Sequence, residues 1–109
     1  METNSIVIVS LVSPREKIWG QLVSLDPAGV TVRGLDLGSF DDFIRQVRLQ
    51  EETTVGVAVV FYPMHRVERI AMDEPSGDIP SVADRFHEKA GMTIQEYLGI
   101  ERTLNRKVQ

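Results

Sequence analysis

The chain has 109 residues, of which 42% are hydrophobic, and a formal net charge of −4 at pH 7. This size fits one compact domain with a buried core. The absence of cysteine excludes disulfides, thiolate chemistry and cysteine-ligated metal sites, and is compatible with a reducing cytoplasm. The acidic balance argues against avid non-specific binding of nucleic acid, because neutralising phosphates requires clustered Lys and Arg.

Targeting and membrane signals are missing from the pattern. The first residues, METNSIVIVSLV, have neither a basic start nor a small-residue cleavage site, so we expect no signal peptide. No apolar run reaches the roughly 20 residues that are needed to cross a bilayer. We therefore expect a soluble, cytoplasmic protein that does not insert into membranes.

Five apolar segments predict β-strands separated by turn signals. In the second strand, Gly20 indicates a bend, a bulge or a close approach of backbones. The turn Asp26-Pro27-Ala28-Gly29 joins the second and third strands in a hairpin, and a change of apolar phase at Gly34 predicts a bulge. The predicted strands are Ile6–Val12, Ile18–Leu25, Val30–Leu37, Val55–Tyr62 and Arg66–Met72.

The stretch Thr53–Met72 is the most informative part of the sequence, because it holds the longest β-branched apolar run and the corner motif that follows it. Its residues from Val55 to Tyr62 are apolar at nearly every position, which favours a strand buried on both faces, as is Ile6–Val12. Pro63 is expected to end this strand at a sharp corner. A flat, Val-rich strand invites aggregation unless both edges are paired, so either the sheet closes on itself or another subunit supplies the neighbour.

Three helices are predicted around these strands. The first spans 40–49, with Ser39 as cap and Asp41 and Asp42 in its first turn. After an acidic linker at 73–80, a second helix begins at Ser81, with Asp84 as capping-box partner, and ends at Gly91. A third is capped by Thr93, with Glu96 at the capping-box position, and the tail beyond Gly99 is either a continuation of this helix or unordered.

These elements predict a mainly β fold with helical additions, a five-stranded, strongly bent antiparallel barrel. Residues 1–72 form the barrel, with the inserted helix at 40–49, and residues 73–109 form the linker and a helical appendage of the same structural domain.

The glycine in the second strand, the step Leu25-Asp26 into a tight turn and the segment VFYPMHRVERI resemble the Sm-like fold of Sm, LSm and bacterial Hfq proteins. The similarity covers about Ser5–Met72, with Gly20 at the family's strand glycine and Asp26 at the acidic residue of its first motif. The Asn expected shortly afterwards is missing, and Arg66-Val67 stands for the family's Arg-Gly pair. The resemblance therefore implies the fold more directly than it implies RNA binding.

The resemblance places the corner residues near the pore of a ring. There His65, Arg66 and Arg69, with Asp26, would contact RNA phosphates or bases. The alternative is structural: His65 caps the corner, and the two arginines pair with carboxylates such as Glu68, Asp73 or Glu74, because Arg binds both groups in the same bidentate way. A metal site built from His65 and His87 lacks further ligands, and we expect no cofactor.

Apolar residues near the fourth and fifth strands are candidates for a subunit interface. Trp19 either faces outward as an anchor or packs on the inserted or C-terminal helices. The candidate interface residues are Trp19, Val57, Val59, Phe61, Tyr62 and Val67.

The sequence-based hypothesis is a non-enzymatic Sm-like homo-oligomeric ring, assembled by pairing the fourth and fifth strands and able to bind RNA at the corner. The alternative is a protein-interaction or regulatory scaffold in which the helices from Ser81 onward dock a protein partner. An enzyme is disfavoured because no nucleophile, base or metal set can be assembled from the pattern.

Overall fold

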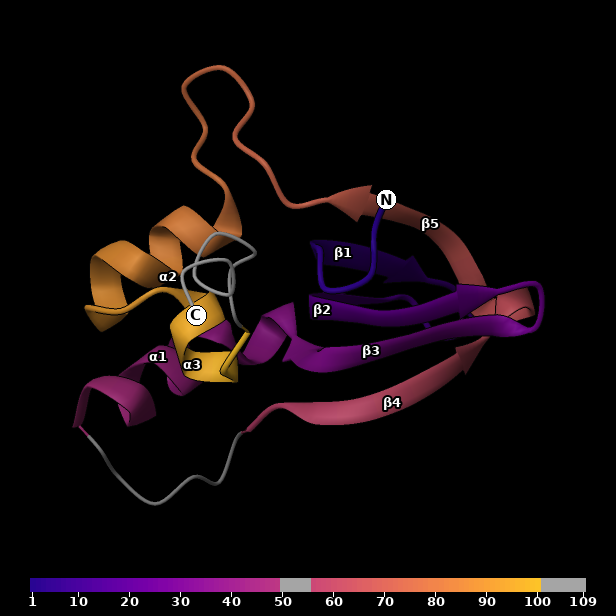
Figure 1. Cartoon of the computed structure of the whole chain (residues 1–109), viewed down its shortest axis with the longest axis horizontal. Coiled ribbons are helices and arrows are strands. Elements are labelled where there is room, and N and C mark those ends of the chain that lie inside the picture. Colours follow the sequence, from indigo (N-terminus) through magenta and orange to yellow (C-terminus); the bar gives the residue numbers. More distant parts are fainter. Residues whose placement is uncertain (50–55, 101–109) are drawn as a thin grey trace, which may run out of the picture. The chain divides into compact units, whose positions relative to one another are not determined.

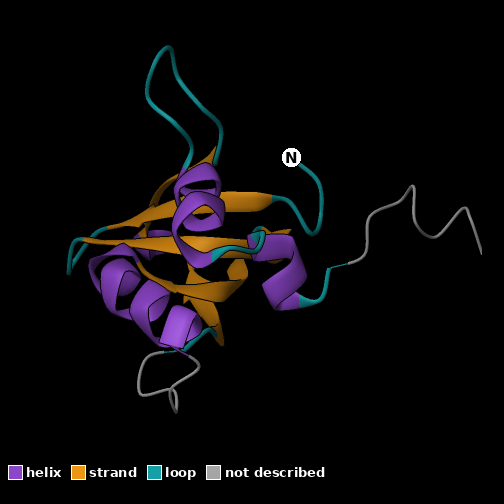
Figure 2. Ribbon diagram, turned by 90° about the vertical axis from the view of Figure 1, so that its left-hand side faces the viewer, coloured by secondary structure: helices purple, strands orange, loops and turns teal. Residues whose placement is uncertain are grey.

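The computed structural model describes residues 1–49 and 56–100. Contacts within the chain divide it into two compact units, Met1–Asp73 and Glu74–Gln109. The first holds the sheet and one helix, and the second holds the two C-terminal helices. Figure 2 distinguishes helices, strands and loops by colour.

The first unit is a five-stranded antiparallel sheet, which confirms the prediction of a mainly β fold. Its strand order is β4-β3-β2-β1-β5, so β4 and β5 stand at the two edges. Both edge strands run to a common corner, where the 3₁₀ turn η2 (Met64–Arg66) joins them (Figure 1). The strands are β1 (Ile6–Leu11), β2 (Glu16–Asp26), β3 (Gly29–Asp36), β4 (Ala58–Pro63) and β5 (Val67–Met72).

One buried cluster of the first unit lies on one face of this sheet. Alternate residues of β1, β2 and β3 supply it, as the two-residue period of a strand requires. Half-buried Tyr62, Val67 and Ile70 pack against it from the edge strands. β1 is buried on nearly its whole length, as predicted. The buried cluster consists of Val7, Val9, Leu11, Ile18, Leu22, Val30 and Val32.

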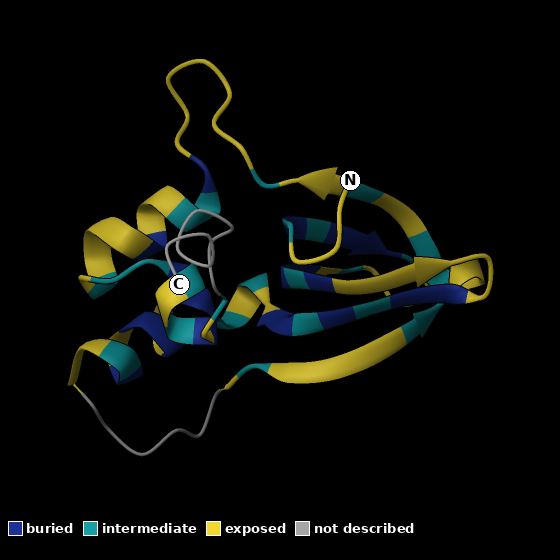
Figure 3. Cartoon of the chain, in the orientation of Figure 1, coloured by how far each residue is buried: buried dark blue, intermediate teal, exposed yellow. Residues whose placement is uncertain are grey.

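The prediction that the Val-rich fourth strand is buried on both faces was wrong. Val59, Val60 and Phe61 of β4 are 63%, 38% and 50% exposed, and Figure 3 shows β4 as an exposed band beside the buried β3. A continuous apolar run does not distinguish a central strand from an edge strand, because both suit the pleated backbone. The run in β4 therefore marks an apolar surface.

The predicted bulge at Gly34 was also wrong. Gly34 pairs in regular register with Gly20, and the register shifts instead in β2, between Leu22 and Ser24. A Cβ on Gly20 would overlap the carbonyl oxygen of Arg33, and one on Gly34 would lie 2.8 Å from the Cα of Gly20. The two glycines thus allow a close approach of β2 and β3, one of the roles expected for Gly20.

The helix α1 (Phe40–Leu49) has the predicted bounds, but its start differs from the prediction. A 3₁₀ turn, η1 (Leu37–Ser39), precedes it, and the cap is Asp36, whose Oδ1 accepts a hydrogen bond from the Gly38 N–H at 2.8 Å. Ser39 therefore lies inside helical backbone and is not the cap. The apolar stripe of α1 is buried as expected, at Phe40, Phe43 and Ile44.

The second unit contains α2 (Val82–Ala90) and α3 (Ile94–Leu98), and both predicted capping boxes are present. The Oγ of Ser81 accepts from the Asp84 N–H at 2.9 Å, and Asp84 accepts in return from the Ser81 N–H at 3.3 Å. The rings of Phe86 and Tyr97 meet edge to face at 6.4 Å. α3 ends at Leu98, where Gly99 takes the left-handed conformation as its C-cap; the predicted tail from 101 to 109 lies outside the described residues.

Candidate functional site

The strand β4 has a hydrogen-bonding edge that no described strand covers, since β3 is its one neighbour within residues 1–49 and 56–100. Its register with β3 runs from Gly34 opposite Ala58 to Gly29 opposite Pro63. The N–H of Met64 donates to the carbonyl of Ala28 at 2.9 Å, which extends this ladder past Pro63.

This bond identifies the residues of β4 whose backbone N–H and C=O groups point to the free edge of the sheet. Antiparallel ladders alternate between residues whose N–H and C=O groups point to the neighbour and residues whose groups point away. Met64 bonds to the β3 side, so Tyr62, Val60 and Ala58 do so too, whereas Val59 and Phe61 direct their backbone groups to the free edge. Proline has no N–H to donate, and Pro63 accordingly falls in the outward-facing set.

The inner face of the same strand borders a cavity of about 400 Å³. Its apolar wall includes Ile18, Val32 and Val60. Among the described residues that line it, none carries an imidazole, thiol or amine group, so these residues supply no nucleophile paired with such a base. Its polar lining residues are Glu16, Asp36, Ser39 and Tyr62.

The surroundings of the Tyr62 hydroxyl raise its pKa. Partial burial raises the pKa of Tyr62 above its ordinary value of 10.0, the negative charge of Glu16 raises it further, Arg66 opposes this, and Asp36 adds to the rise. Both burial and carboxylates disfavour the phenolate. Tyr62 therefore stays protonated at neutral pH and offers an O–H donor to the cavity.

Arg66, a predicted ligand-binding residue, is engaged within the chain. Its Nε donates to the carbonyl of Val12 at 3.0 Å, and one terminal nitrogen donates to the carbonyl of Pro14 at 2.8 Å and to the Oε2 of Glu16 at 3.1 Å. These bonds tie the corner to the β1–β2 turn. They favour the structural alternative for Arg66, with Glu16 in place of the carboxylates that the sequence suggested.

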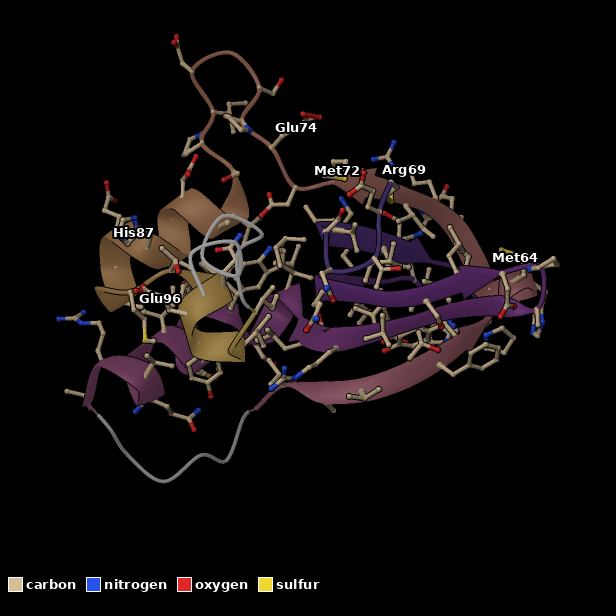
Figure 4. All side chains as sticks on the ribbon, viewed as in Figure 1. Met64, Arg69, Met72, Glu74, His87 and Glu96 are labelled. Atoms are coloured by element: carbon tan, nitrogen blue, oxygen red, sulfur yellow. The ribbon has the colours of Figure 1, made fainter. Side chains whose placement is uncertain are left out.

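The other predicted corner residues, His65 and Arg69, are exposed. Figure 4 shows Arg69 on β5 with its side chain directed away from the sheet. In the part of the chain that the structure describes, neither side chain makes a hydrogen bond or ion pair with a neighbour. The three basic side chains thus share no common partner, because Arg66 turns back into the fold.

Asp26, the fourth predicted ligand residue, holds its own turn together. Its Oδ1 accepts from the N–H groups of Ala28 at 2.8 Å and Gly29 at 3.3 Å. This is the bond that favours Asp at the first position of a tight turn. The observed contacts of Asp26 are those of the β2–β3 hairpin.

Trp19 is not an exposed interface anchor. Its side chain is fully buried, its ring meets Phe40 of α1 edge to face at 5.5 Å, and its indole N–H donates to the Oδ2 of Asp73 at 2.9 Å. The alternative that Trp19 packs on the inserted helix is the observed one. The reason is its phase, since Trp19 lies on the face of β2 opposite to Ile18 and that face is covered by α1.

The remaining interface candidates divide by exposure. Val59 and Phe61 are exposed, while Tyr62 and Val67 pack against the core and Val57 is half-buried. Sequence reasoning missed the partners Glu16 and Asp73, which lie 50 and 54 residues from Arg66 and Trp19. The sequence signal for these partners was their position as polar residues at strand ends: Glu16 begins β2 and Asp73 follows β5.

Comparisons of the chain with protein-family models, with curated proteins and with solved structures find no significant match. Within residues 1–49 and 56–100, no helix is both long and apolar enough to span a bilayer. The same residues contain no group of three or more His, Asp or Glu side chains arranged to hold a metal ion.

The role of Arg66 can be tested through stability. We expect Arg66→Ala to lower the free energy of unfolding by about 2 kcal/mol, because it removes three hydrogen bonds of a largely buried cation and leaves Glu16 without its partner. The matched control is the exposed Arg69→Ala, expected within about 0.5 kcal/mol of the parent. Chemical denaturation measures both. If both variants lost equally little free energy of unfolding, the bonds of Arg66 within the chain would not stabilise the fold, and Arg66 would again be a candidate ligand-binding residue.

Proposed function

We propose that the chain is a non-catalytic, Sm-like small barrel that assembles with copies of itself through the edges of its sheet. The observation that carries the proposal is that β4 is apolar, exposed and unpaired along its outer edge among the described residues. The strand order supports the Sm-like part, because it places the two strands that flank the corner at opposite edges.

An edge of this kind is unusual on a free subunit. Edge strands generally carry charges, proline or bulges that prevent pairing with another chain. β4 reads AVVFYP and has no ionised side chain at neutral pH, with its single proline at the end. Pairing would satisfy the outward backbone groups of Val59 and Phe61 and remove their side chains from water, which favours association by the hydrophobic effect.

Binding of RNA at the corner is not part of the proposal, because Arg66 already has three partners within the chain. The cavity on the inner face of β4 supports a binding module rather than an enzyme, since the described residues of its lining offer polar and apolar contacts and include no nucleophile beside an imidazole or amine.

Solution mass tests the proposal. Size exclusion with light scattering is expected to give a discrete mass above that of one chain, and Val59→Lys is expected to shift it to the monomer by placing a charge on the paired strand. Ile79→Lys is the matched control, because Ile79 is 70% exposed and lies outside the sheet; its mass is expected to equal the parent's. A parent that is monomeric at its highest soluble concentration would contradict the proposal.

A further inference from the structure

We infer that the partner of the β4 edge is the β4 edge of a second copy, in an antiparallel pair whose two-fold axis passes through Val60. This inference rests on the proposed self-assembly and names the surface that is used. It differs from the sequence-based expectation of a ring, in which β4 of one copy would pair with β5 of the next.

The backbone groups of β4 complement themselves in this register. With Val60 opposite Val60 of the second copy, Val59 lies opposite Phe61 of that copy, and Phe61 lies opposite its Val59. These are the residues whose N–H and C=O groups face the free edge, as the bond from Met64 to Ala28 shows. Each such pair exchanges two hydrogen bonds, so the edge forms four bonds and leaves neither residue's outward N–H unpaired.

The side chains match as well. On the outer face, the register sets Val59 against Phe61 of the second copy twice, and pairs of a β-branched and an aromatic residue are favourable across strands. On the inner face, Ala58 meets Tyr62 of the second copy. Because Ala58 lines the cavity, the pairing brings a second tyrosine to the cavity's border.

The distribution of charge favours β4 over β5 as the partner edge. Pairing a strand with itself brings like residues together near the axis, so any charge there would be repelled by its own copy, and the chain as a whole carries −4. β4 has no such charge, whereas β5 (VERIAM) exposes Glu68 and Arg69. Charged side chains on an edge strand oppose strand addition, so β5 is the protected edge and β4 the open one.

Cysteine cross-linking tests the register directly, because the chain has no cysteine of its own. In a non-hydrogen-bonded pair the two Cα atoms lie about 4.5 Å apart, inside the range of about 4.4–6.8 Å that a disulfide spans. Val60→Cys is therefore expected to form a covalent dimer under mild oxidation. Val59→Cys is the matched control, because Val59 is more exposed than Val60, at 63% against 38%. In the proposed register the two copies of residue 59 lie diagonally across the pair, so they are expected to link at least tenfold more slowly than the two copies of residue 60.

A second pair of variants keeps the test decisive if Val60→Cys does not fold. An equimolar mixture of Val59→Cys and Phe61→Cys is expected to link mainly as the mixed dimer, since these positions face each other across the axis. A mixture of Val60→Cys with Ile70→Cys on β5 reports the ring arrangement. Mass spectrometry of the linked peptides, without reduction, identifies each product.

The outcomes separate this inference from the proposed function. A disulfide between the two copies of residue 60, together with a parent mass above that of one chain, supports both the two-fold pair and self-assembly. An assembled parent that links β4 to β5 but not β4 to β4 overturns the two-fold pair and leaves self-assembly intact. An assembled parent in which neither link forms also overturns the pair, and a parent that stays monomeric and shows no preferred link overturns both.

Discussion

Replacing Trp19 by alanine is expected to lower the free energy of unfolding by about 3–5 kcal/mol, the range observed for truncating a buried aromatic side chain. The indole is fully buried and meets the Phe40 ring at 5.5 Å, with an angle of 83° between the planes. Truncation would leave a void between β2 and α1, and would leave the carboxylate of Asp73 without the N–H that it accepts at 2.9 Å. Chemical denaturation followed by circular dichroism measures the loss.

Two further variants separate packing from hydrogen bonding at this site. Trp19→Phe keeps an aromatic ring against Phe40 but removes the donor, and Asp73→Ala removes the acceptor. Each is expected to cost about 1–3 kcal/mol, less than Trp19→Ala, because the indole–carboxylate hydrogen bond is lost while most of the packing stays. A Trp19→Ala variant as stable as the parent would show that the indole is solvent-exposed, as an interface anchor would be.

Gly34→Ala is expected to destabilise the sheet by at least about 1–3 kcal/mol, the usual cost of forcing extra volume into a packed site. A Cβ at Gly34 would overlap the carbonyl oxygen of Trp19 and lie 2.8 Å from the Cα of Gly20. Neither obstacle is a flexible side chain, so relief requires β2 and β3 to separate. Thermal unfolding is expected to show a midpoint lower by several degrees.

Gly38→Ala is the matched control for this change. At Gly38 the nearest obstacle to a new Cβ is the Oδ1 of Asp36 at 3.4 Å, the far end of a side chain. The same chemical change is therefore expected to alter the free energy of unfolding by less than about 1 kcal/mol. Equal losses at Gly34 and Gly38 would contradict the close approach of the two strands.

Local signals predicted the elements well. The bounds of α1 and the caps at Ser81 and Thr93 depend on short-range chemistry, namely an apolar stripe and side chains that accept the first free N–H groups of a helix. The corner after Pro63 follows from the missing N–H of proline in the same way.

The site depended on tertiary neighbours that no local pattern contains. The apolar run of β4 fits a buried strand and an exposed edge equally well, and strand order alone decides between them. Likewise, the local sequence around Arg66 does not tell whether its partner is a phosphate or Glu16, because the carboxylate lies 50 residues away. The direction of the Trp19 side chain depended on α1 covering that face of β2.

Amide hydrogen exchange along β4 tests self-pairing at this edge most directly. The N–H groups of Val60 and Tyr62 face β3 and serve as internal controls, protected whatever the state of the edge, whereas those of Val59 and Phe61 face outward. Exchange slows when an amide is hydrogen-bonded in stable structure. At concentrations where the chain is assembled, the self-pairing account predicts that all four amides are protected and that Val59→Lys restores fast exchange at position 61. Fast exchange at Val59 and Phe61 beside protected Val60 and Tyr62, in the parent chain at its highest soluble concentration, would contradict it.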